Sequence, residues 1–241
     1  MTQQLLFDLD DTLIYCNRYF FRAIDDFANQ LVAWFSDAKL SPQDVKDKQA
    51  AFDTELIQQS GFKSEHFPNS FIETYNYYCD KLRVPQAAAH REWLWQIGME
   101  VYNHKTEAYP FMEETLSQLQ HEGHELHLYT GGEPHIQLRK IEDMELSRFF
   151  EQRIYVRQVK NIDALEQILQ QQQFERTKTW MIGNSIRNDI VPALHAGIHA
   201  IHVEIPDEWH HNIIDVNIQP RGRFLSVQSL QQIPSIISSS T

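Results

Sequence analysis

Two aspartates, two positions apart at the end of a short apolar run, are the residues of this sequence that most clearly suggest metal binding or catalysis. Asp8 and Asp10 follow Gln4-Leu5-Leu6-Phe7, which is expected to form a buried strand. On an extended chain, residues two apart point to the same face. Neighbouring carboxylates repel one another unless a proton or a cation joins them. The pair therefore favours a site for a hard divalent cation such as Mg²⁺, which takes oxygen ligands; the alternative is a strand that ends in an aspartate-rich turn.

Residues that could hold an oxyanion follow two later apolar stretches. Thr130-Gly131-Gly132 comes directly after a run that ends at Tyr129. A hydroxyl beside glycine amides can cradle an anion, because glycine lets the backbone approach closely, although an isolated Thr-Gly-Gly is also an ordinary turn. Lys160 opens the helix expected after Ile154-Tyr155-Val156, where a cation would neutralise a transferring phosphoryl group. Arg157 is the alternative source of that charge, and the position of Lys160 at a helix start favours Lys160.

A further group of polar residues follows the apolar run Thr179-Trp180-Met181-Ile182. Gly183 and Asn184 come first, and Asp189 lies one turn later. Both polar side chains carry oxygen atoms of the kind that Mg²⁺ binds, but the amide oxygen of Asn184 brings no charge. The chain thus places an aspartate pair, a hydroxyl with glycines, a lysine and this last pair after four successive apolar runs.

The elements that must position these residues alternate along most of the chain. Apolar runs at 4–7, 124–129, 154–156, 179–182, 200–203 and 224–227 predict strands, and helical spacing predicts helices over about 111–121, 134–146, 162–172 and 187–196, with one more at the C-terminus. This alternation predicts an α/β fold, a three-layer, doubly wound parallel sheet with helices on both faces. In such a sheet ligands bind at the carboxyl ends of the strands, where the polar residues stand.

Residues 15–105 interrupt the alternation. Apolar residues recur at helical spacing over about 17–35, 68–82 and 86–103, and Ser41, Pro42 and Gly61 mark the two ends of another helix. No convincing strand is found there. We therefore expect a catalytic core of residues 1–14 and 106–241, and an inserted helical domain of residues 15–105 near the ligand-binding edge of the sheet.

Composition narrows the classes of partner. The chain has 241 residues, 42% of them hydrophobic, and a formal net charge of −12, which argues against nucleic acid and against an anionic membrane surface. The sequence shows neither a signal peptide nor an apolar run approaching ~20 residues. We expect a cytoplasmic protein in which Cys16 and Cys79 are free thiols.

The four polar clusters, taken in order, resemble the four motifs of the haloacid dehalogenase (HAD) superfamily. The stretch from Asp8 to Thr12 resembles the first motif, Asp-x-Asp-x-Thr; Thr130 resembles the second, Lys160 the third, and the segment from Gly183 to Asp189 the fourth. The fourth motif is commonly Gly-Asp-x-x-x-x-Asp, so Asn184 departs from it. The helical insertion resembles the family's cap of the first type. The resemblance covers residues 5 to about 205 apart from that insertion.

The resemblance implies a role for each residue. Asp8 would attack phosphorus, and Asp10 would act as general acid and then as general base. Thr130, Gly131 and Lys160 would bind the phosphoryl group. Mg²⁺ would be held by the oxygens of Asp8, Asp10, Asn184 and Asp189. The loop after residue 203, which carries Trp209, His210 and His211, follows the fourth motif and is a weaker candidate to approach the site.

The function implied is Mg²⁺-dependent hydrolysis of a phosphate monoester on a small soluble metabolite, through an aspartyl phosphate, by a monomer or homodimer. One alternative is a 2-haloacid dehalogenase, because Asn at position 184 is reminiscent of the family's metal-free enzymes. Those enzymes lack a second aspartate in the first motif, whereas Asp10 is present here. The other alternative is a non-catalytic binding or regulatory protein on the same scaffold. The retention of four residues without an evident packing role argues against it: Asp8, Asp10, Thr130 and Lys160.

Overall fold

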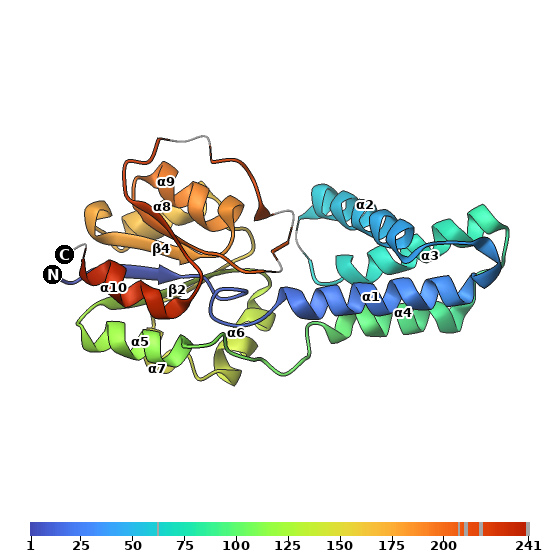
Figure 1. Ribbon diagram of the computed structural model, residues 1–241, viewed down its shortest axis with the longest axis horizontal. Coiled ribbons are helices and arrows are strands. Elements are labelled where there is room, and N and C mark those ends of the chain that lie inside the picture. Colours follow the sequence, from blue (N-terminus) through green and yellow to red (C-terminus); the bar gives the residue numbers. More distant parts are fainter. Residues whose placement is uncertain (62, 207, 210–211, 217–218, 240–241) are drawn as a thin grey trace. The chain divides into compact units, whose positions relative to one another are not determined.

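The chain forms two compact units in the computed structural model, which describes residues 1–61, 63–206, 208–209, 212–216 and 219–239. One unit consists of Met1–Asn17 and Thr106–Thr241, and the other of Arg18–Lys105 (Figure 1). The first contains all the strands among the described residues, and the second contains helices only. Hydrophobic clusters fill the interior of each unit.

A six-stranded parallel sheet forms the centre of the first unit, as the sequence predicts. Its strand order is β3-β2-β1-β4-β5-β6. In chain order the strands are β1 Gln4–Phe7, β2 Glu125–Gly131, β3 Ile154–Arg157, β4 Thr179–Gly183, β5 His199–Val203 and β6 Phe224–Val227. In the register, Phe7 of β1 lies between Leu128 of β2 and Ile182 of β4. The central strand β1 therefore ends opposite Leu128 and Ile182, while β2 continues to Gly131 and β4 to Gly183, and the residues after Phe7 lie at the carboxyl edge between these two strands.

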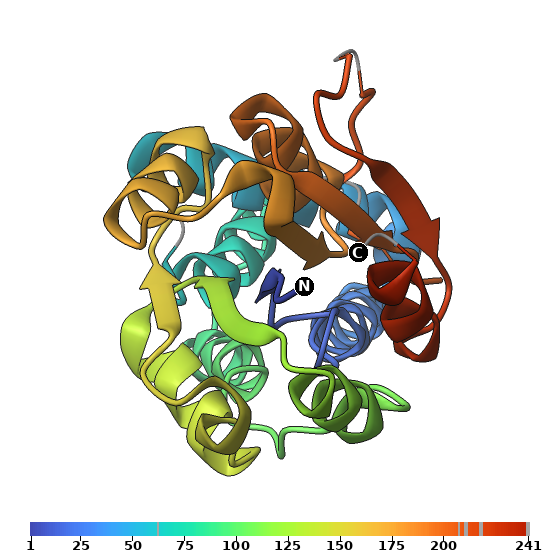
Figure 2. The ribbon, with the colours of Figure 1, turned by 90° about the vertical axis from the view of Figure 1, so that its left-hand side faces the viewer.

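Helices cover both faces of the sheet (Figure 2). Side chains of β1 alternate between two hydrophobic clusters: Leu5 and Phe7 belong to one and Leu6 to the other. The first cluster includes residues of α5 Met112–His121, α7 Ser147–Phe150 and α10 Ile233–Ser238, and the second includes residues of α8 Ile162–Gln171 and α9 Val191–Ala196. Because both faces of the sheet are buried, its strands appear in the sequence as continuous apolar runs.

Two predicted helices of this unit differ from the observed ones. The helix expected over 134–146 is α6 Pro134–Asp143, and the chain turns at Glu145, which has a φ of 50°, before α7 begins. The helix expected over 187–196 starts as a π-helical turn, Ile186–Ile190, that continues into α9. Short 3₁₀ turns at Arg176–Lys178 and Leu230–Gln232 complete the unit.

The second unit contains the four helices that the sequence predicts between residues 15 and 105. They are α1 Asn17–Trp34, α2 Pro42–Ser60, α3 His66–Leu82 and α4 Ala88–Glu100, with a 3₁₀ turn at Ser36–Ala38. Ser41 caps α2 through a capping box with Asp44. Aromatic rings fill the interior, where Phe27 and Phe71 stack with their centroids 4.3 Å apart. No helix in the described part of the chain is long and apolar enough to cross a membrane.

Candidate active site

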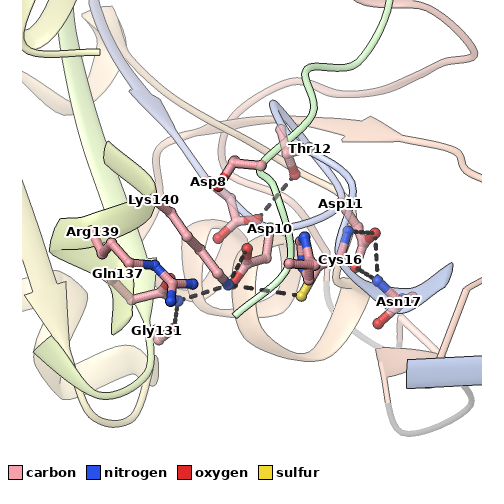
Figure 3. Close-up of polar contacts among 12 residues, drawn as sticks. Asp8, Asp10, Asp11, Thr12, Cys16, Asn17, Gly131, Gln137, Arg139 and Lys140 are labelled. Atoms are coloured by element: carbon pink, nitrogen blue, oxygen red, sulfur yellow. Dashed lines mark hydrogen bonds and ion pairs between the residues drawn. The ribbon is translucent and has the colours of Figure 1, made fainter. Parts of the chain in front are cut away.

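The loop after β1 holds the aspartates in a fixed turn. The Asp8 N–H donates to the Ile182 carbonyl of β4, and Asp11 adopts a left-handed conformation with a φ of 58°. The carboxylate of Asp11 accepts the N–H groups of Cys16 and Asn17 at 2.9 and 3.0 Å (Figure 3). Burial raises the pKa of Asp11 to about 7 although these hydrogen bonds oppose the rise. Asp11 therefore closes the turn that presents the other two aspartates.

Lys160 joins two buried carboxylates at the carboxyl edge of the sheet. Its Nζ lies 2.6 Å from Oδ1 of Asp8 and also forms an ion pair with Asp189. All three side chains are at least nine-tenths buried, so each charge depends on the others for compensation. The competing Arg157 donates instead to the Val156 carbonyl. Of the two basic residues considered from the sequence, Lys160 is the one placed against Asp8.

The three charges shift one another's ionisation. Burial raises the pKa of Asp8 to about 7; the Lys160 ammonium opposes this rise, and the nearby Asp189 carboxylate adds to it. For Lys160, burial works toward a lower pKa, but the carboxylates of Asp189 and Asp8 together raise its pKa above the usual range. Lys160 is therefore a permanent cation beside Asp8.

Thr130 and Gly131 at the end of β2 border this lysine. The Oγ1 atom of Thr130 is buried and makes no hydrogen bond to any residue that the structure describes. An unsatisfied buried hydroxyl is costly and needs an explanation; a bound anion is one. A Cβ on Gly131 would lie 3.3 Å from the aliphatic stem of Lys160. Glycine at this position lets the lysine pass close over the strand end.

The fourth cluster is held together by its backbone. The π-helical turn forms because Ile190 donates its N–H to the Ser185 carbonyl five residues earlier. It turns Asp189 back toward β4, where Ser185 donates its N–H to Oδ2 of Asp189 at 3.0 Å. A Cβ on Gly183 would come within 2.3 Å of that oxygen, so only glycine leaves room. Both oxygens of Asp189 are thus engaged, one by Lys160 and one by Ser185.

Thr12 links the first and fourth clusters. Its Oγ1 lies 3.0 Å from Oδ2 of Asp8 and 3.2 Å from Oδ1 of Asn184, and it accepts the Asn184 N–H at 3.1 Å. One carboxylate oxygen and one amide oxygen are therefore gathered at a single hydroxyl. From the sequence, Thr12 is expected only as a member of the first motif, and these contacts give it a place between the two clusters.

These oxygens fit Mg²⁺. Mg²⁺ usually takes one or two carboxylates from the protein and keeps several waters. Asp8 and Asn184 offer a carboxylate and a carbonyl oxygen on the same side, and the backbone carbonyl of Asp10 is the third ligand predicted. The contacts of Asp189 favour a role in holding Lys160, and its role as a metal ligand remains a prediction. The described residues contain no group of three or more His, Cys, Asp or Glu side chains arranged to hold a metal.

The side chain of Asp10 lies against two residues of α6. The Nζ atom of Lys140 is 2.8 Å from Oδ1, and Nε2 of Gln137 is 2.9 Å from Oδ2 (Figure 3). Gln137 also donates to the Gly131 carbonyl. Neither residue is among those that the sequence predicts for the site. Their spacing of three on one helix, directly after the Thr-Gly-Gly segment, was the available signal, because such residues share a helix face.

Glu208 is the second addition to the site. Its Oε2 accepts the side-chain N–H of Asn184 at 2.9 Å, and its Oε1 accepts from Asn212 at 2.7 Å and from the Trp209 backbone at 3.0 Å. Burial raises the pKa of Glu208 against these hydrogen bonds. The loop after residue 203 thus reaches the site through Glu208; His210 and His211, the candidates in that loop, lie outside the described residues.

Comparisons with known proteins identify the family through a family model and the fold through solved structures. The model of the haloacid dehalogenase-like hydrolases matches residues 5–203. No curated protein matches significantly. A haloacid dehalogenase-like family hydrolase from Xanthomonas campestris has a TM-score of 0.77 at 22% identity, over 99% of this chain and 96% of that one.

Two further solved structures show the same fold with different descriptions. One is a HAD-hydrolase from Bacillus subtilis, YfnB, bound to magnesium, with a TM-score of 0.64, 21% identity and 98% coverage of both chains. The other is a 2-haloacid dehalogenase from Pseudomonas syringae, with a TM-score of 0.59, 14% identity and full coverage of both chains. Likeness at these identities establishes the fold, and the family match extends over most of the sequence. The chain belongs to the haloacid dehalogenase-like hydrolases and is a hydrolase of that family.

Proposed function

We propose that the protein is a Mg²⁺-dependent phosphatase that hydrolyses phosphate monoesters of small metabolites through an aspartyl phosphate. The observation that carries the proposal is the buried ion pair between Asp8 and Lys160 at 2.6 Å, together with the buried hydroxyl of Thr130, which has no hydrogen-bond partner among the described residues. A carboxylate, a fixed cation and a hydroxyl donor follow the ends of the neighbouring strands β1, β3 and β2, and we assign to them the roles of nucleophile, charge neutralisation and phosphoryl binding. This is the set that phosphoryl transfer needs, because its catalysis consists mainly of positioning and charge stabilisation.

The reaction divides into two displacements at phosphorus. In the first, a carboxylate oxygen of Asp8 bonds to phosphorus while the bond to the leaving oxygen breaks, and Asp10 gives that oxygen its proton. In the second, Asp10 takes a proton from water, the water oxygen bonds to phosphorus, and the bond to Asp8 breaks. Thr130, the Gly131 amide and Lys160 hold the phosphoryl oxygens. Magnesium, held by Asp8, Asn184 and the Asp10 carbonyl, supplies positive charge to the transferring group when bound.

The unit Arg18–Lys105 is proposed to select the substrate. This unit begins shortly after the turn that carries Asp8 and Asp10, and the chain returns to the first unit at Thr106. Exchanging its exposed polar residues should change the ranking of phosphorylated substrates while Asp8 can still be phosphorylated. An unchanged ranking across a broad set of such variants would contradict this role.

The test of the function compares wild-type protein with Asp8→Asn, using p-nitrophenyl phosphate with added Mg²⁺ and with EDTA. We expect Mg²⁺-dependent release of p-nitrophenol from wild type and none above background from Asp8→Asn, because the nearly isosteric amide cannot attack. Asp163→Asn, an exposed carboxylate change in α8, is the matched control and should keep full activity. Wild-type activity in purified, folded Asp8→Asn would overturn the assignment.

A dehalogenase is the second candidate, favoured by the uncharged Asn184. In that reaction Asp8 would displace halide from carbon without metal. Release of halide from 2-haloacids in the presence of EDTA, with no release of phosphate from phosphate esters, would establish it. The contact of Asp10 with Gln137 and Lys140 supports the phosphatase, because a second catalytic carboxylate is needed for acid–base steps and not for halide displacement.

A further inference from the structure

Both polar atoms of the Asn184 side-chain amide take part in hydrogen bonds. Its Oδ1 accepts from the Thr12 hydroxyl at 3.2 Å, and its Nδ2 donates to Glu208 at 2.9 Å. Its backbone is equally fixed, by Thr12 at the N–H and by Nε2 of His202 at the carbonyl. The position of the residue is therefore set by the β4 edge, and only the direction of its amide is left to the partners of the side chain.

The direction of that amide decides whether Asn184 can bind a cation. Rotation by half a turn would exchange oxygen and nitrogen and would present N–H donors, which no cation accepts as ligands. A carboxylate accepts hydrogen bonds and donates none when ionised, so Glu208 can face only the nitrogen. Its hydrogen bond therefore holds the oxygen toward Asp8, on the side where the ligands predicted for Mg²⁺ gather.

The carboxylate of Glu208 is held by N–H groups and not by a lysine or arginine of the described residues. It accepts three N–H donors, from Asn184, Asn212 and Trp209, and no lysine or arginine in the described ranges forms an ion pair with it. A partly buried carboxylate without a lysine or arginine counterion is costly. A divalent cation at Asn184 would lie one side chain away and would compensate this charge.

We propose that Glu208 is a positioning residue of the magnesium site, which directs the Asn184 carbonyl at the cation and supplies the negative charge that an aspartate at position 184 would bring. The proposal rests on the magnesium dependence of the proposed function and deepens it. Partners behind metal ligands orient them and increase their basicity, and removing such a partner typically weakens metal binding 10- to 100-fold.

Direct titration of Mg²⁺ into substrate-free protein by calorimetry tests the proposal without relying on activity. We expect Glu208→Gln to raise the dissociation constant about tenfold or more, by the loss of its charge and of the fixed amide direction. Glu204→Gln removes the same charge from an exposed site in the same connection and should leave the constant within about twofold. Equal constants for wild type and Glu208→Gln would overturn the proposal.

An exchange of the two side chains separates this role from a merely structural one. In Asn184→Asp combined with Glu208→Gln, one carboxylate and one amide remain in hydrogen-bonding contact with their places exchanged. Magnesium affinity should return to the wild-type value or exceed it, even if Glu208→Gln alone folds poorly. A double variant that folds and binds as weakly as Glu208→Gln would contradict the inference.

The same titrations distinguish failure of the inference from failure of the proposed function. Wild-type protein that binds Mg²⁺, loses affinity in Glu208→Gln and hydrolyses no phosphate ester would leave the inference standing and overturn the phosphatase. Wild-type protein that does not bind Mg²⁺ at millimolar concentration would overturn the inference together with the metal dependence.

Discussion

The ammonium group of Lys140 lies 2.8 Å from one oxygen of Asp10 and 2.9 Å from the other. The two residues are 130 positions apart in the sequence, and the lysine side chain is almost fully buried. Burial works toward a lower pKa of Lys140, but the Asp10 carboxylate outweighs it and raises the pKa. Lys140 is therefore charged at all working pH values and fixes the direction of the proposed acid–base carboxylate.

Lys140→Met should lower turnover of a phosphate ester about 10- to 100-fold, because general acid–base catalysis contributes roughly 10²- to 10⁴-fold and depends on position. The Michaelis constant should change little, since Lys140 contacts Asp10 and none of the residues assigned to phosphoryl binding. Steady-state kinetics measures both. Lys178→Met, which removes a surface lysine paired with Glu175, is the control; if both variants kept wild-type turnover, the position of Asp10 would not depend on Lys140.

Asp189→Asn should destabilise the protein by about 3–5 kcal/mol, as expected when one partner of a buried ion pair is removed. Lys160 would keep only Asp8 as a counterion, and the amide introduced by the substitution would have one oxygen fewer to offer to Lys160 and the Ser185 N–H. Urea denaturation at pH 7 measures the free energy of unfolding. Asp163→Asn serves again as the surface control, and a loss under about 1 kcal/mol in Asp189→Asn would mean that the ion pair contributes little.

The sheet and the sites at its edge could be predicted because local patterns encode them. The runs around Leu6 and Trp180 are apolar on both faces, which marks central parallel strands, and polar residues begin where those runs end. Lys160 was preferred over Arg157 for the same reason, since a helix start fixes the place of the residue relative to the strand edge. The contact with Asp8 agrees with that choice.

The contacts of Lys140 and Glu208 could not be predicted because no local pattern records them. Lys140 is a charged residue on a helix whose apolar residues, such as Ile141, mark its buried face, and the contact of Lys140 with Asp10 results from where α6 lies against the loop after β1. Glu208 lies in an irregular loop, where the direction of a side chain cannot be inferred from a helical or strand repeat. The π-helical turn was missed because it differs from an α-helix by one hydrogen-bond step, which apolar spacing over five residues does not reveal.

His127 gives the protein a pH-dependent stability. The ring lies in β2 against Phe174, with centroids 4.6 Å apart, and burial, with a smaller effect of Arg153, lowers its pKa to about 4. The unfolded chain, with a histidine pKa near 6.5, binds the proton more readily, so stability falls as the pH decreases from about 6.5 toward 4. The full loss amounts to about 3 kcal/mol at ~1.4 kcal/mol per pH unit.

Between pH 7 and pH 5, wild type should therefore lose about 2 kcal/mol more of its free energy of unfolding than His127→Gln, which cannot take up the proton. Urea denaturation at the two pH values measures the difference. His121→Gln, at an exposed histidine, should behave as wild type. If wild type and His127→Gln had the same pH dependence, His127 would not be the group that titrates.

Asn184→Asp changes the charge at the proposed magnesium site without changing its shape. Two unit charges ~4 Å apart interact by about 4 kcal/mol at an effective dielectric constant of ~20. Desolvation and bound water offset most of this, which leaves roughly 1–2 kcal/mol, or about tenfold in affinity. The concentration of Mg²⁺ that gives half-maximal activity should fall accordingly.

The new carboxylate at position 184 would also face Glu208 across the present 2.9 Å contact. The metal-free variant should therefore unfold at a lower temperature than wild type, and added Mg²⁺ should stabilise it more. Activity and thermal unfolding, each titrated with Mg²⁺ in both proteins, measure the two effects. An unchanged or higher Mg²⁺ requirement in the variant would mean that Asn184 is not a metal ligand.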